Sequence, residues 1–329
     1  MGDNAEAWQA YVKKKLTQDL QAADFQWSLF VAALHSYRHD SVLRPFPPMF
    51  TTDDNDNKDF DRLVAIADSL PSLTSIQKDD SLGNMDSATL ELLYWVLNTR
   101  HFYLKSCSKE TMAELQTMTG QVTSVPQPNY IFEVIYEGTA EDKFCEKKSG
   151  HDLIYAFHGS RTENFHSILH CGLQGHMNKN ALYGEGTYLS SELSVSLNYS
   201  PTGTAWNHSL ISNQLSCLAF CEIIDDPSVK CQVKDANDAR SSRQRSLIQG
   251  SLGGEVPEKY YVVQNSDVLR VKYILVYASS APLHRFESSW FRRHKFILSL
   301  LLYASLLVVI ALYNSRMYQM FLRKYLRKQ

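Results

Sequence analysis

Four short segments in the second half of this sequence carry side chains that can take part in chemistry. They combine a histidine next to a glycine, two small hydroxyl side chains and several tyrosines. In order, the segments are His158-Gly159-Ser160, Gly184-Glu185-Gly186-Thr187-Tyr188, the pair Ser196 and Tyr199, and Lys259-Tyr260-Tyr261-Val262-Val263. Each of them alone is ordinary, but their order and spacing together are not, so we treat them as one candidate site.

The residue types in this candidate site are suited to binding a ring and positioning it. Tyrosine rings stack well on cationic aromatic groups. A bare glycine backbone lets a ligand approach more closely than any other residue allows. A phenol, with an ordinary pKa of about 10, donates hydrogen bonds but is a poor base at neutral pH. The alternatives are that His158-Gly159 only forms a turn at a strand end and that the tyrosines pack in a core.

Several other chemistries find no support in the sequence. The six cysteines contain no C-x-x-C pair and no zinc-ligand spacing, so we expect no metal. No G-x-G-x-x-G follows a strand-like stretch, which disfavours hydride transfer on a Rossmann fold. The net charge of -2 provides no basic field, and we expect no nucleic-acid partner. The cysteines are Cys107, Cys145, Cys171, Cys217, Cys221 and Cys231.

The elements that precede the candidate site follow a helical pattern from Ala5 to about Gly120. Apolar residues at helical spacing predict one helix over 24–43, which prolines at 45, 47 and 48 stop. Asp86 or Ser87 is expected to cap a helix through LELLYWVLNTRHF, and Ser108 another through KETMAELQTM. We therefore predict a helical, possibly regulatory domain over 1–120 and a linker over 121–129.

After the linker, β-branched and aromatic residues predict strands that position the candidate site. Two helical stretches, NFHSILHCGL and SELSVSLNYS, interrupt these strands, and Cys231 to Glu255 is predicted to be a long surface loop. The predicted strands cover 130–137, 152–159, 185–190, 215–224, 259–265 and 269–278.

In this order, the segments of residues 130–279 resemble the catalytic domain of the diphtheria-toxin-like poly(ADP-ribose) polymerase family. With the helical region and an apolar C-terminal segment added, the chain is most similar to that family's tail-anchored mono-ADP-ribosyltransferase type. The resemblance implies an α+β fold with a split, mixed β-sheet as the catalytic domain, over 130–280. It also implies that NAD⁺ is consumed as a substrate, with no cofactor permanently bound.

The resemblance implies a role for each residue of the candidate site. His158 would bond the adenosine-side ribose of NAD⁺, and the backbone of Gly159, next to Ser160, would pair with the nicotinamide amide. Tyr188 would line the nicotinamide pocket, with Tyr199 stacked on the ring and Ser196 bonded to its carboxamide. The implied catalytic triad is His158, Tyr188 and Tyr260.

The sequence departs from the polymerases at Tyr260, where those enzymes carry a catalytic glutamate. A neutral phenol can bond a ribose, but it does not activate a ribose hydroxyl for chain elongation. Single transfer to a protein side chain remains possible, because a carboxylate acceptor is already an anion. Tyr260 and Tyr261 are alternatives for this position. A catalytically weak or dead NAD⁺ or ADP-ribose sensor, or a tail-anchored adaptor, is the alternative function.

The reaction implied by the resemblance is glycosyl transfer. Nicotinamide leaves C1 of the ribose through an oxocarbenium-like transition state similar to that of glycoside hydrolysis. Catalysis then depends on positioning and on a reactive pose of the ribose. The expected acceptors are proteins near the membrane of the endoplasmic reticulum, the enzyme itself included.

Near the C-terminus, the segment FILSLLLYASLLVVIALY at 296–313 contains no charged residue. It would extend about 27 Å as a helix, enough for a thin bilayer. Basic residues flank it, within a juxtamembrane segment at 281–295 and a tail at 314–329. We predict one membrane-spanning helix that contacts the lipid bilayer. A buried core helix is the alternative.

The N-terminus has no apolar core typical of a signal peptide. We therefore expect post-translational insertion, with the bulk of the chain in the cytosol and the cysteines reduced. The expected location is the membrane of the endoplasmic reticulum, possibly continuing into the nuclear envelope, and a role in stress signalling there is a hypothesis.

Overall fold

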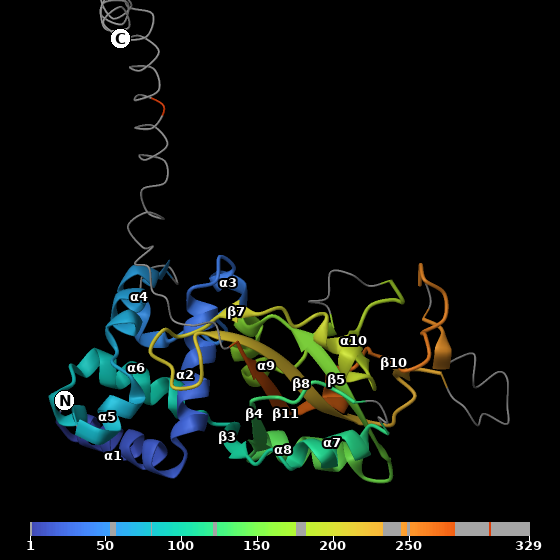
Figure 1. Cartoon of the computed structure of the whole chain (residues 1–329), viewed down its shortest axis with the longest axis horizontal. Coiled ribbons are helices and arrows are strands. Elements are labelled where there is room, and N and C mark those ends of the chain that lie inside the picture. Colours follow the sequence, from blue (N-terminus) through green and yellow to red (C-terminus); the bar gives the residue numbers. More distant parts are fainter. Residues whose placement is uncertain are drawn as a thin grey trace, which may run out of the picture. The chain divides into compact units, whose positions relative to one another are not determined.

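Helices form the N-terminal part of the fold and strands form most of the rest (Figure 1). The computed structural model describes residues 2–52, 57–79, 81–120, 124–175, 182–232, 245–248, 251–279 and Tyr303. Met1–Ser280 is one unit and Ala281–Gln329 a second. Apart from Tyr303, the predicted segments at 281–295, 296–313 and 314–329 lie outside the described residues. Among the described residues, no helix has both the length and the apolar character needed to cross a bilayer.

Three helices of the helical half begin at an aspartate. The Asp19, Asp59 and Asp86 side chains accept hydrogen bonds from backbone N–H groups in the first turns of α2, α4 and α6, so Asp86 is the cap of its helix. The elements are α1 Gly2–Gln18, α2 Leu20–Leu34, α3 His39–Val42, η1 Pro48–Phe50, β1 Thr51–Thr52, β2 Asn57–Lys58, α4 Phe60–Ser69, α5 Leu73–Asp79, η2 Ser81–Asn84 and α6 Ser87–Leu97.

The helix predicted over 24–43 is two helices in the structure, because a turn interrupts it. The Ser36 hydroxyl accepts a bond from the Arg38 N–H, and the Ser36 carbonyl is 3.1 Å from Nδ1 of His39. Side chains that bond nearby backbone groups in this way compete with helical bonding. The chain therefore leaves α2 at Leu34 and starts α3 at His39.

One nine-stranded sheet carries the second half, in the order β3-β4-β11-β8-β5-β6-β10-β9, with β7 beside β8. Every pairing among the described strands is antiparallel, so the predicted mixed sheet is wrong in this respect. Residue patterns identify strands but not their directions. The strands are β3 Phe102–Cys107, β4 Tyr130–Tyr136, β5 Leu153–Ser160, β6 Thr187–Ser190, β7 Gly203–Thr204, β8 Gln214–Ile224, β9 Val229–Lys230, β10 Tyr260–Val263 and β11 Leu269–Ala278.

Short helices connect these strands. They are α7 Thr111–Met118, α8 Thr139–Lys148, η3 Thr162–Asn164, α9 Phe165–Cys171, α10 Leu193–Leu197 and η5 Ser266–Val268. The predicted α+β arrangement, with a helical domain ahead of the sheet domain, is confirmed.

The sheet starts earlier in the chain than the sequence pattern predicted. Helix α6 ends at Leu97, and residues 102–107, which had been assigned to the helical region, form edge strand β3. Phe102 and Leu104 are buried, whereas Lys105 is exposed. Strand β3 pairs with β4 along its whole length. This alternation is the period of a strand.

Helix α2 belongs to two hydrophobic cores at once. Ala22, Phe25 and Leu29 pack in the core of the sheet, and Phe25 stacks on Phe132 of β4 with ring centroids 4.4 Å apart. Trp27 and Phe30 on other faces pack in the helical core. An all-round apolar helix is expected to be buried on every side, and α2 connects the two halves in this way.

A loop between β7 and β8 makes the reverse connection. Trp206 of this loop is buried in the helical core, 6.1 Å from the Trp27 ring. The buried Asp24 carboxylate accepts bonds from the Ser209 hydroxyl and from the Leu210 N–H, the latter at 3.1 Å. The helical half is therefore packed against the sheet half through core contacts and buried polar bonds.

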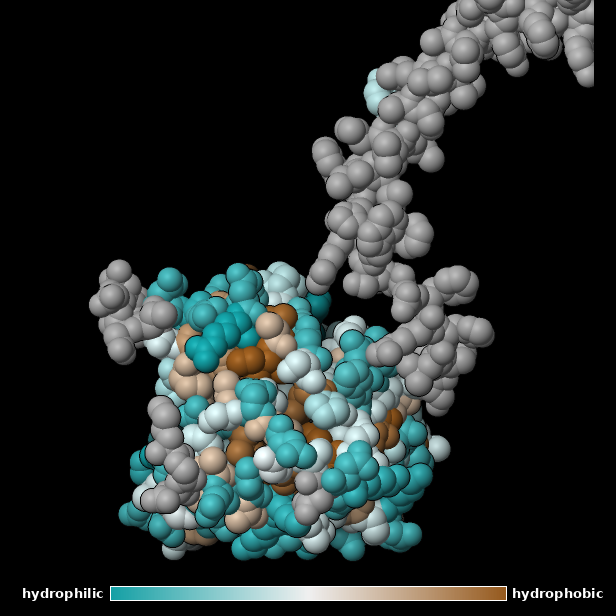
Figure 2. Space-filling view, turned by 90° about the vertical axis from the view of Figure 1, so that its left-hand side faces the viewer, coloured by the Kyte–Doolittle hydropathy of each residue, from teal (hydrophilic) through white to brown (hydrophobic). Residues whose placement is uncertain are grey.

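The outer surface of the helical half is mostly polar. Figure 2 looks onto this end of the molecule and shows hydrophilic side chains around small, separated apolar areas. This is the pattern of helices whose apolar stripes face a core.

Candidate functional site

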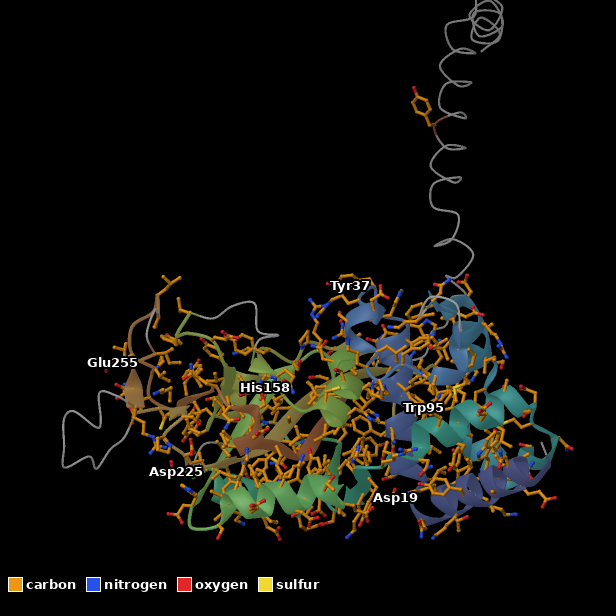
Figure 3. All side chains as sticks on the ribbon, turned by 180° about the vertical axis from the view of Figure 1, so that it is seen from behind. Asp19, Tyr37, Trp95, His158, Asp225 and Glu255 are labelled. Atoms are coloured by element: carbon orange, nitrogen blue, oxygen red, sulfur yellow. The ribbon has the colours of Figure 1, made fainter. Side chains whose placement is uncertain are left out.

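The sheet splits between β5 and β6, and the predicted site residues lie around the split. Strand β5 pairs with β8 along all its residues, but with β6 only through Phe157 and Ser190 in the described residues. Beyond Phe157, His158 bridges the gap. Its Nδ1 lies 2.8 Å from the Tyr188 carbonyl of β6. Figure 3 labels His158 at this position among the strands.

The bond to the Tyr188 carbonyl fixes the protonation of His158. A carbonyl only accepts, so Nδ1 carries the proton and Nε2 is the acceptor of the neutral ring. Burial lowers the pKa of His158, which keeps the ring neutral at physiological pH. The neutral ring has an acceptor nitrogen to offer a ribose hydroxyl, and the role that the resemblance implies for His158 stays a prediction.

Gly159 has a steric reason to be glycine. A Cβ at this position would lie 1.9 Å from the Ser196 carbonyl oxygen and 2.9 Å from the Tyr199 Cβ. Helix α10 therefore packs directly on β5. The Ser196 hydroxyl donates a 2.9 Å bond to the Phe157 carbonyl, which holds the helix there and leaves the oxygen as an acceptor for a carboxamide N–H.

Ser160 is the last residue of β5, and Tyr199 follows α10, so one residue comes from each partner of the β5–α10 contact. The Tyr199 side chain is 63% exposed, so its ring is open to a stacking partner. The Ser160 hydroxyl accepts a 2.9 Å bond from the Asn164 amide at the start of the following helical turn. These bonds fix the end of β5 next to α10.

The Tyr188 hydroxyl is held by the backbone of the preceding turn. It donates to the Gly184 carbonyl at 2.7 Å and accepts from the Tyr183 N–H at 2.9 Å. Its pKa is raised, chiefly by burial. The Tyr188 hydroxyl therefore shapes the turn, and the expected role of its ring in a nicotinamide pocket stays a prediction.

The strand pairing distinguishes Tyr260 from Tyr261. In the β10–β6 register, Tyr260 is opposite Ser190 and Val262 is opposite Tyr188. Tyr260 therefore shares a sheet face with Tyr188, because side chains alternate along a strand. Tyr261 points to the other face and packs against the main core. The register therefore places Tyr260, and not Tyr261, on the face of Tyr188, and the correspondence of Tyr260 to the glutamate position stays a prediction.

Tyr260 is neutral and surrounded by other phenols. Burial raises its pKa, and the nearby phenols of Tyr199 and Tyr183 raise it further. Lys259 before it has a φ of 70°, a conformation that side chains rarely adopt, and its carbonyl accepts bonds from the Ser191 N–H and the Ser190 hydroxyl. These bonds hold a strained residue that sets the start of β10.

Tyr183 is a site residue that the sequence reading missed. Its ring lies 6.4 Å from the Tyr188 ring, and it packs in the same small cluster as Tyr188 and Tyr260. No motif marks it, since it precedes the Gly184-Glu185-Gly186 turn in a stretch with no strand or helix pattern. The only signal was an aromatic residue five positions before Tyr188.

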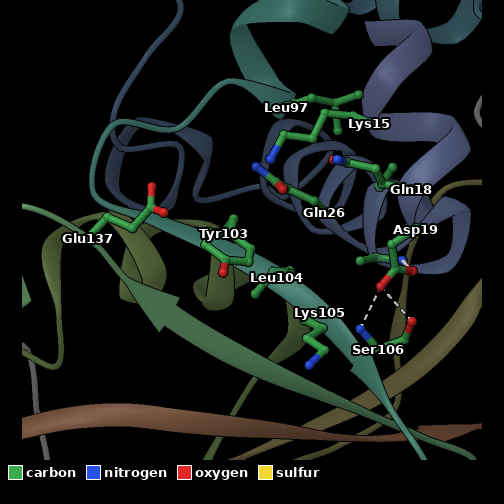
Figure 4. A pocket seen from close by; sticks show the side chains of 12 residues that line it. Lys15, Gln18, Asp19, Gln26, Leu97, Tyr103, Leu104, Lys105, Ser106 and Glu137 are labelled. Atoms are coloured by element: carbon green, nitrogen blue, oxygen red, sulfur yellow. Dashed lines mark hydrogen bonds between the residues drawn. The ribbon is translucent and has the colours of Figure 1, made fainter. Parts of the chain in front are cut away.

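A cavity of about 660 Å³ lies apart from this cluster, between α2 and edge strand β3 (Figure 4). Lys15, Gln26 and Glu137 are among its lining residues, so it is polar and carries both charges. Asp19 closes one end by accepting bonds from the Ser106 N–H and hydroxyl. None of the predicted site residues lines it.

The structure therefore places the His-Gly end of β5 against β6, beside the cluster of Tyr183, Tyr188 and Tyr260. A family model described as the poly(ADP-ribose) polymerase catalytic domain matches residues 108–279, and an ARTD15 N-terminal domain model matches residues 14–97. The chain therefore belongs to the poly(ADP-ribose) polymerase family. The catalytic match begins at 108, earlier than the resemblance at 130 suggested, and so takes in the region after β3.

The relatives specify the branch of the family. The chain is 45% identical to the protein mono-ADP-ribosyltransferase PARP16 of Homo sapiens, covering 95% of this chain and 96% of that protein. It is 44% identical to PARP16 of Mus musculus, with the same coverage. Mus musculus PARP8, also a protein mono-ADP-ribosyltransferase, is 24% identical over 64% of this chain and 29% of its own length. These comparisons confirm the predicted family and enzyme class.

Proposed function

We propose that this chain cleaves NAD⁺ and transfers one ADP-ribose unit to protein side chains, its own included. The observation that carries the proposal is the placement of neutral Tyr260 on the face of Tyr188, at the position where polymerases have glutamate. The names of the PARP16 relatives describe the same activity.

In this proposal, the split between β5 and β6 receives NAD⁺. The Nε2 atom of His158 accepts a hydroxyl of the adenosine-side ribose, and the Gly159 backbone, next to Ser160, pairs with the carboxamide. Tyr199, open to solvent, stacks on the nicotinamide, and Ser196 accepts from its amide. The rings of Tyr188 and Tyr260 enclose the nicotinamide-side ribose.

The bond between C1 of that ribose and the nicotinamide nitrogen breaks, and its electron pair leaves with nicotinamide. An acceptor oxygen or nitrogen then forms a bond to C1. The charge that develops on the ribose resembles that in glycoside hydrolysis. A carboxylate acceptor needs no base, whereas a lysine acceptor must first lose a proton. Tyr260 can donate to the ribose but does not take a proton from a second ribose hydroxyl, so elongation stops.

We further propose that the chain is anchored in the membrane of the endoplasmic reticulum, with its folded unit in the cytosol. The support is the uncharged sequence at 296–313 with basic residues on both sides. Acceptors would then be cytosolic parts of proteins in that membrane, and a role in stress signalling there is our hypothesis.

The second candidate is an NAD⁺ or ADP-ribose sensor without turnover, or a tail-anchored adaptor. One observation favours it: the Tyr188 hydroxyl is already bonded to the backbone groups of the preceding turn. A sensor would bind NAD⁺ without releasing nicotinamide.

Labelling of the full chain with biotinylated NAD⁺ tests the proposal. The wild type should label itself and release nicotinamide. His158→Ala and Tyr199→Ala should each label more than about tenfold less, because a lost ribose bond or ring stack costs about 1–3 kcal/mol of binding. Both variants should keep the wild-type melting temperature. Binding of NAD⁺ without any label on the wild type would support the sensor instead.

A further inference from the structure

Three exposed leucines lie on two loops beside the tyrosine cluster. Leu182 is 52% exposed, Leu247 43% and Leu252 89%. We call these three residues the leucine rim. Single exposed leucines are common on proteins, but several that gather at one place next to a candidate active site indicate a binding surface.

Hydrogen bonds hold the leucine rim in its exposed position. The Gly253 N–H donates to the Leu182 carbonyl at 2.8 Å, which joins the two loops. The Val256 N–H donates to the Ser246 carbonyl at 2.7 Å, and Leu247 forms a bridge with Glu255, which Figure 3 labels. Defined bonds between the loops therefore present the leucines.

The leucine rim is continuous with the candidate catalytic cluster. Gly253 packs on Tyr183 so closely that a Cβ there would lie 2.7 Å from the ring. Ile248 and Val256 of the same loop are buried in one cluster with Tyr183, Tyr188 and Tyr260. Whatever molecule covers the leucine rim therefore lies next to the reacting ribose.

We propose that the leucine rim binds large apolar side chains of the acceptor protein, next to the residue that receives ADP-ribose. The inference rests on the proposed transferase function. NAD⁺ itself carries charged phosphates and hydroxyl-rich riboses, which gain little from leucine side chains. The acceptor polypeptide is the other reactant that must reach C1, and its apolar side chains would gain by burial. The enzyme should therefore prefer acceptors with apolar neighbours.

Two pairs of synthetic peptides test this preference with the full chain. The acceptor residue is Glu in one pair and Lys in the other. Within each pair, one peptide has Leu on both sides of the acceptor and the other has Ser. The enzymes are the wild type, the double variant Leu182→Ser/Leu252→Ser, and a matched control, Met118→Ser. Met118 is also exposed, at 46%, but belongs to α7. Transfer to peptide and release of nicotinamide to water are measured together.

For the wild type and for Met118→Ser, the KM for the Leu-flanked peptide should be about tenfold lower than the KM for the Ser-flanked peptide. The reason is that burial of one leucine side chain raises affinity by about tenfold or more. The double variant should lose this preference while its nicotinamide release to water stays within about twofold of wild type. Equal use of both peptides by the wild type would overturn the inference but not the transferase function.

Two other outcomes are distinct. Normal peptide transfer by the double variant, combined with weaker binding to phosphatidylcholine vesicles, would make the leucine rim a membrane contact and overturn the inference. Absence of nicotinamide release from the wild type would overturn the proposed function and, with it, this inference.

Discussion

At the scale of residues, close packing rather than charge distinguishes the candidate site. Gly159 has no space for a side chain, burial lowers the pKa of His158 so that its ring is neutral, and Tyr260 is a phenol, neutral near pH 7. A site of neutral donors and acceptors acts by orienting its substrate. This agrees with a reaction in which the leaving nicotinamide needs no acid.

Gly159→Ala should disrupt the site through α10. The new methyl group would overlap the Ser196 carbonyl, so the helix carrying Tyr199 must move. We expect a loss of about 1–3 kcal/mol of stability, typical of overpacking, and weaker NAD⁺ binding. Thermal melting and NAD⁺ titration measure both. Gly83→Ala is the control, because a Cβ there meets nothing within 4 Å. If Gly159→Ala bound NAD⁺ as well as this control, our account of the β5–α10 contact would be wrong.

The order of chemically capable residues was readable from the sequence, but their relation in space was not. The Tyr260-Tyr261 pair was ambiguous because both residues are tyrosines, and only the pairing of β10 with β6 separates their faces. Tyr183 was missed because its packing against Gly253 joins segments about seventy positions apart, and such a contact leaves no local pattern. The roles of the site residues stay predictions.

At the scale of elements, α2 and the loop after β7 connect the two halves. The loop follows β7, places Trp206 in the helical core and leads into β8. The buried Asp24 carboxylate is the polar centre of this attachment.

Asp24 should make this attachment sensitive to pH. Burial raises the pKa of Asp24 from 3.8 to about 6, against the opposing bonds from Ser209 and the backbone. A raised folded-state pKa means that its stability contribution is present below pH 3.8 and is lost as pH rises to about 6. The loss amounts to about 3 kcal/mol, since each pKa unit corresponds to about 1.4 kcal/mol.

Asp24→Asn removes this titration while it keeps a side chain of the same size. The difference in unfolding free energy, variant minus wild type, should therefore become more positive as pH rises from 4 to 7, because only the wild type loses stability over this range. Urea unfolding at several pH values measures this difference. Asp59→Asn, at a helix cap that is only partly buried, is the comparison. A difference that did not change with pH for Asp24→Asn would contradict the account.

Strands rich in β-branched and aromatic residues were predictable from the sequence. The predicted strands at 130–137, 152–159, 185–190, 215–224, 259–265 and 269–278 agree with β4, β5, β6, β8, β10 and β11 within two residues. Strand β3 was missed because an apolar helix precedes it directly. The loop predicted over 231–255 is not entirely at the surface, because Cys231, Ser246 and Ile248 are buried by tertiary contacts.

At the scale of the whole molecule, the folded unit ends at Ser280 and the apolar segment follows it. Both hydrophobic cores lie within Met1–Ser280. The sequence alone indicated a helical domain ahead of a transferase domain, and the family models match in that order.

A chain that ends at Ser280 should therefore stay folded and bind NAD⁺, but lose its attachment to membranes. The shortened chain keeps every residue of the sheet core and of the helical core. Its melting temperature should therefore lie within a few degrees of the melting temperature of the full chain. Carbonate extraction of membranes and a thermal melt measure the two properties. If the shortened chain remained in the membrane fraction, the segment at 296–313 would not be the anchor.

The central claim is that one ADP-ribose, and no more, is attached at each site because Tyr260 replaces glutamate. Mass spectrometry of the automodified wild-type chain tests it most directly. We expect every modified residue to carry a single ADP-ribose, and Tyr260→Phe to give the same product more slowly, because only a hydrogen bond is lost. Two or more linked ADP-ribose units on one residue of the wild type would contradict the claim.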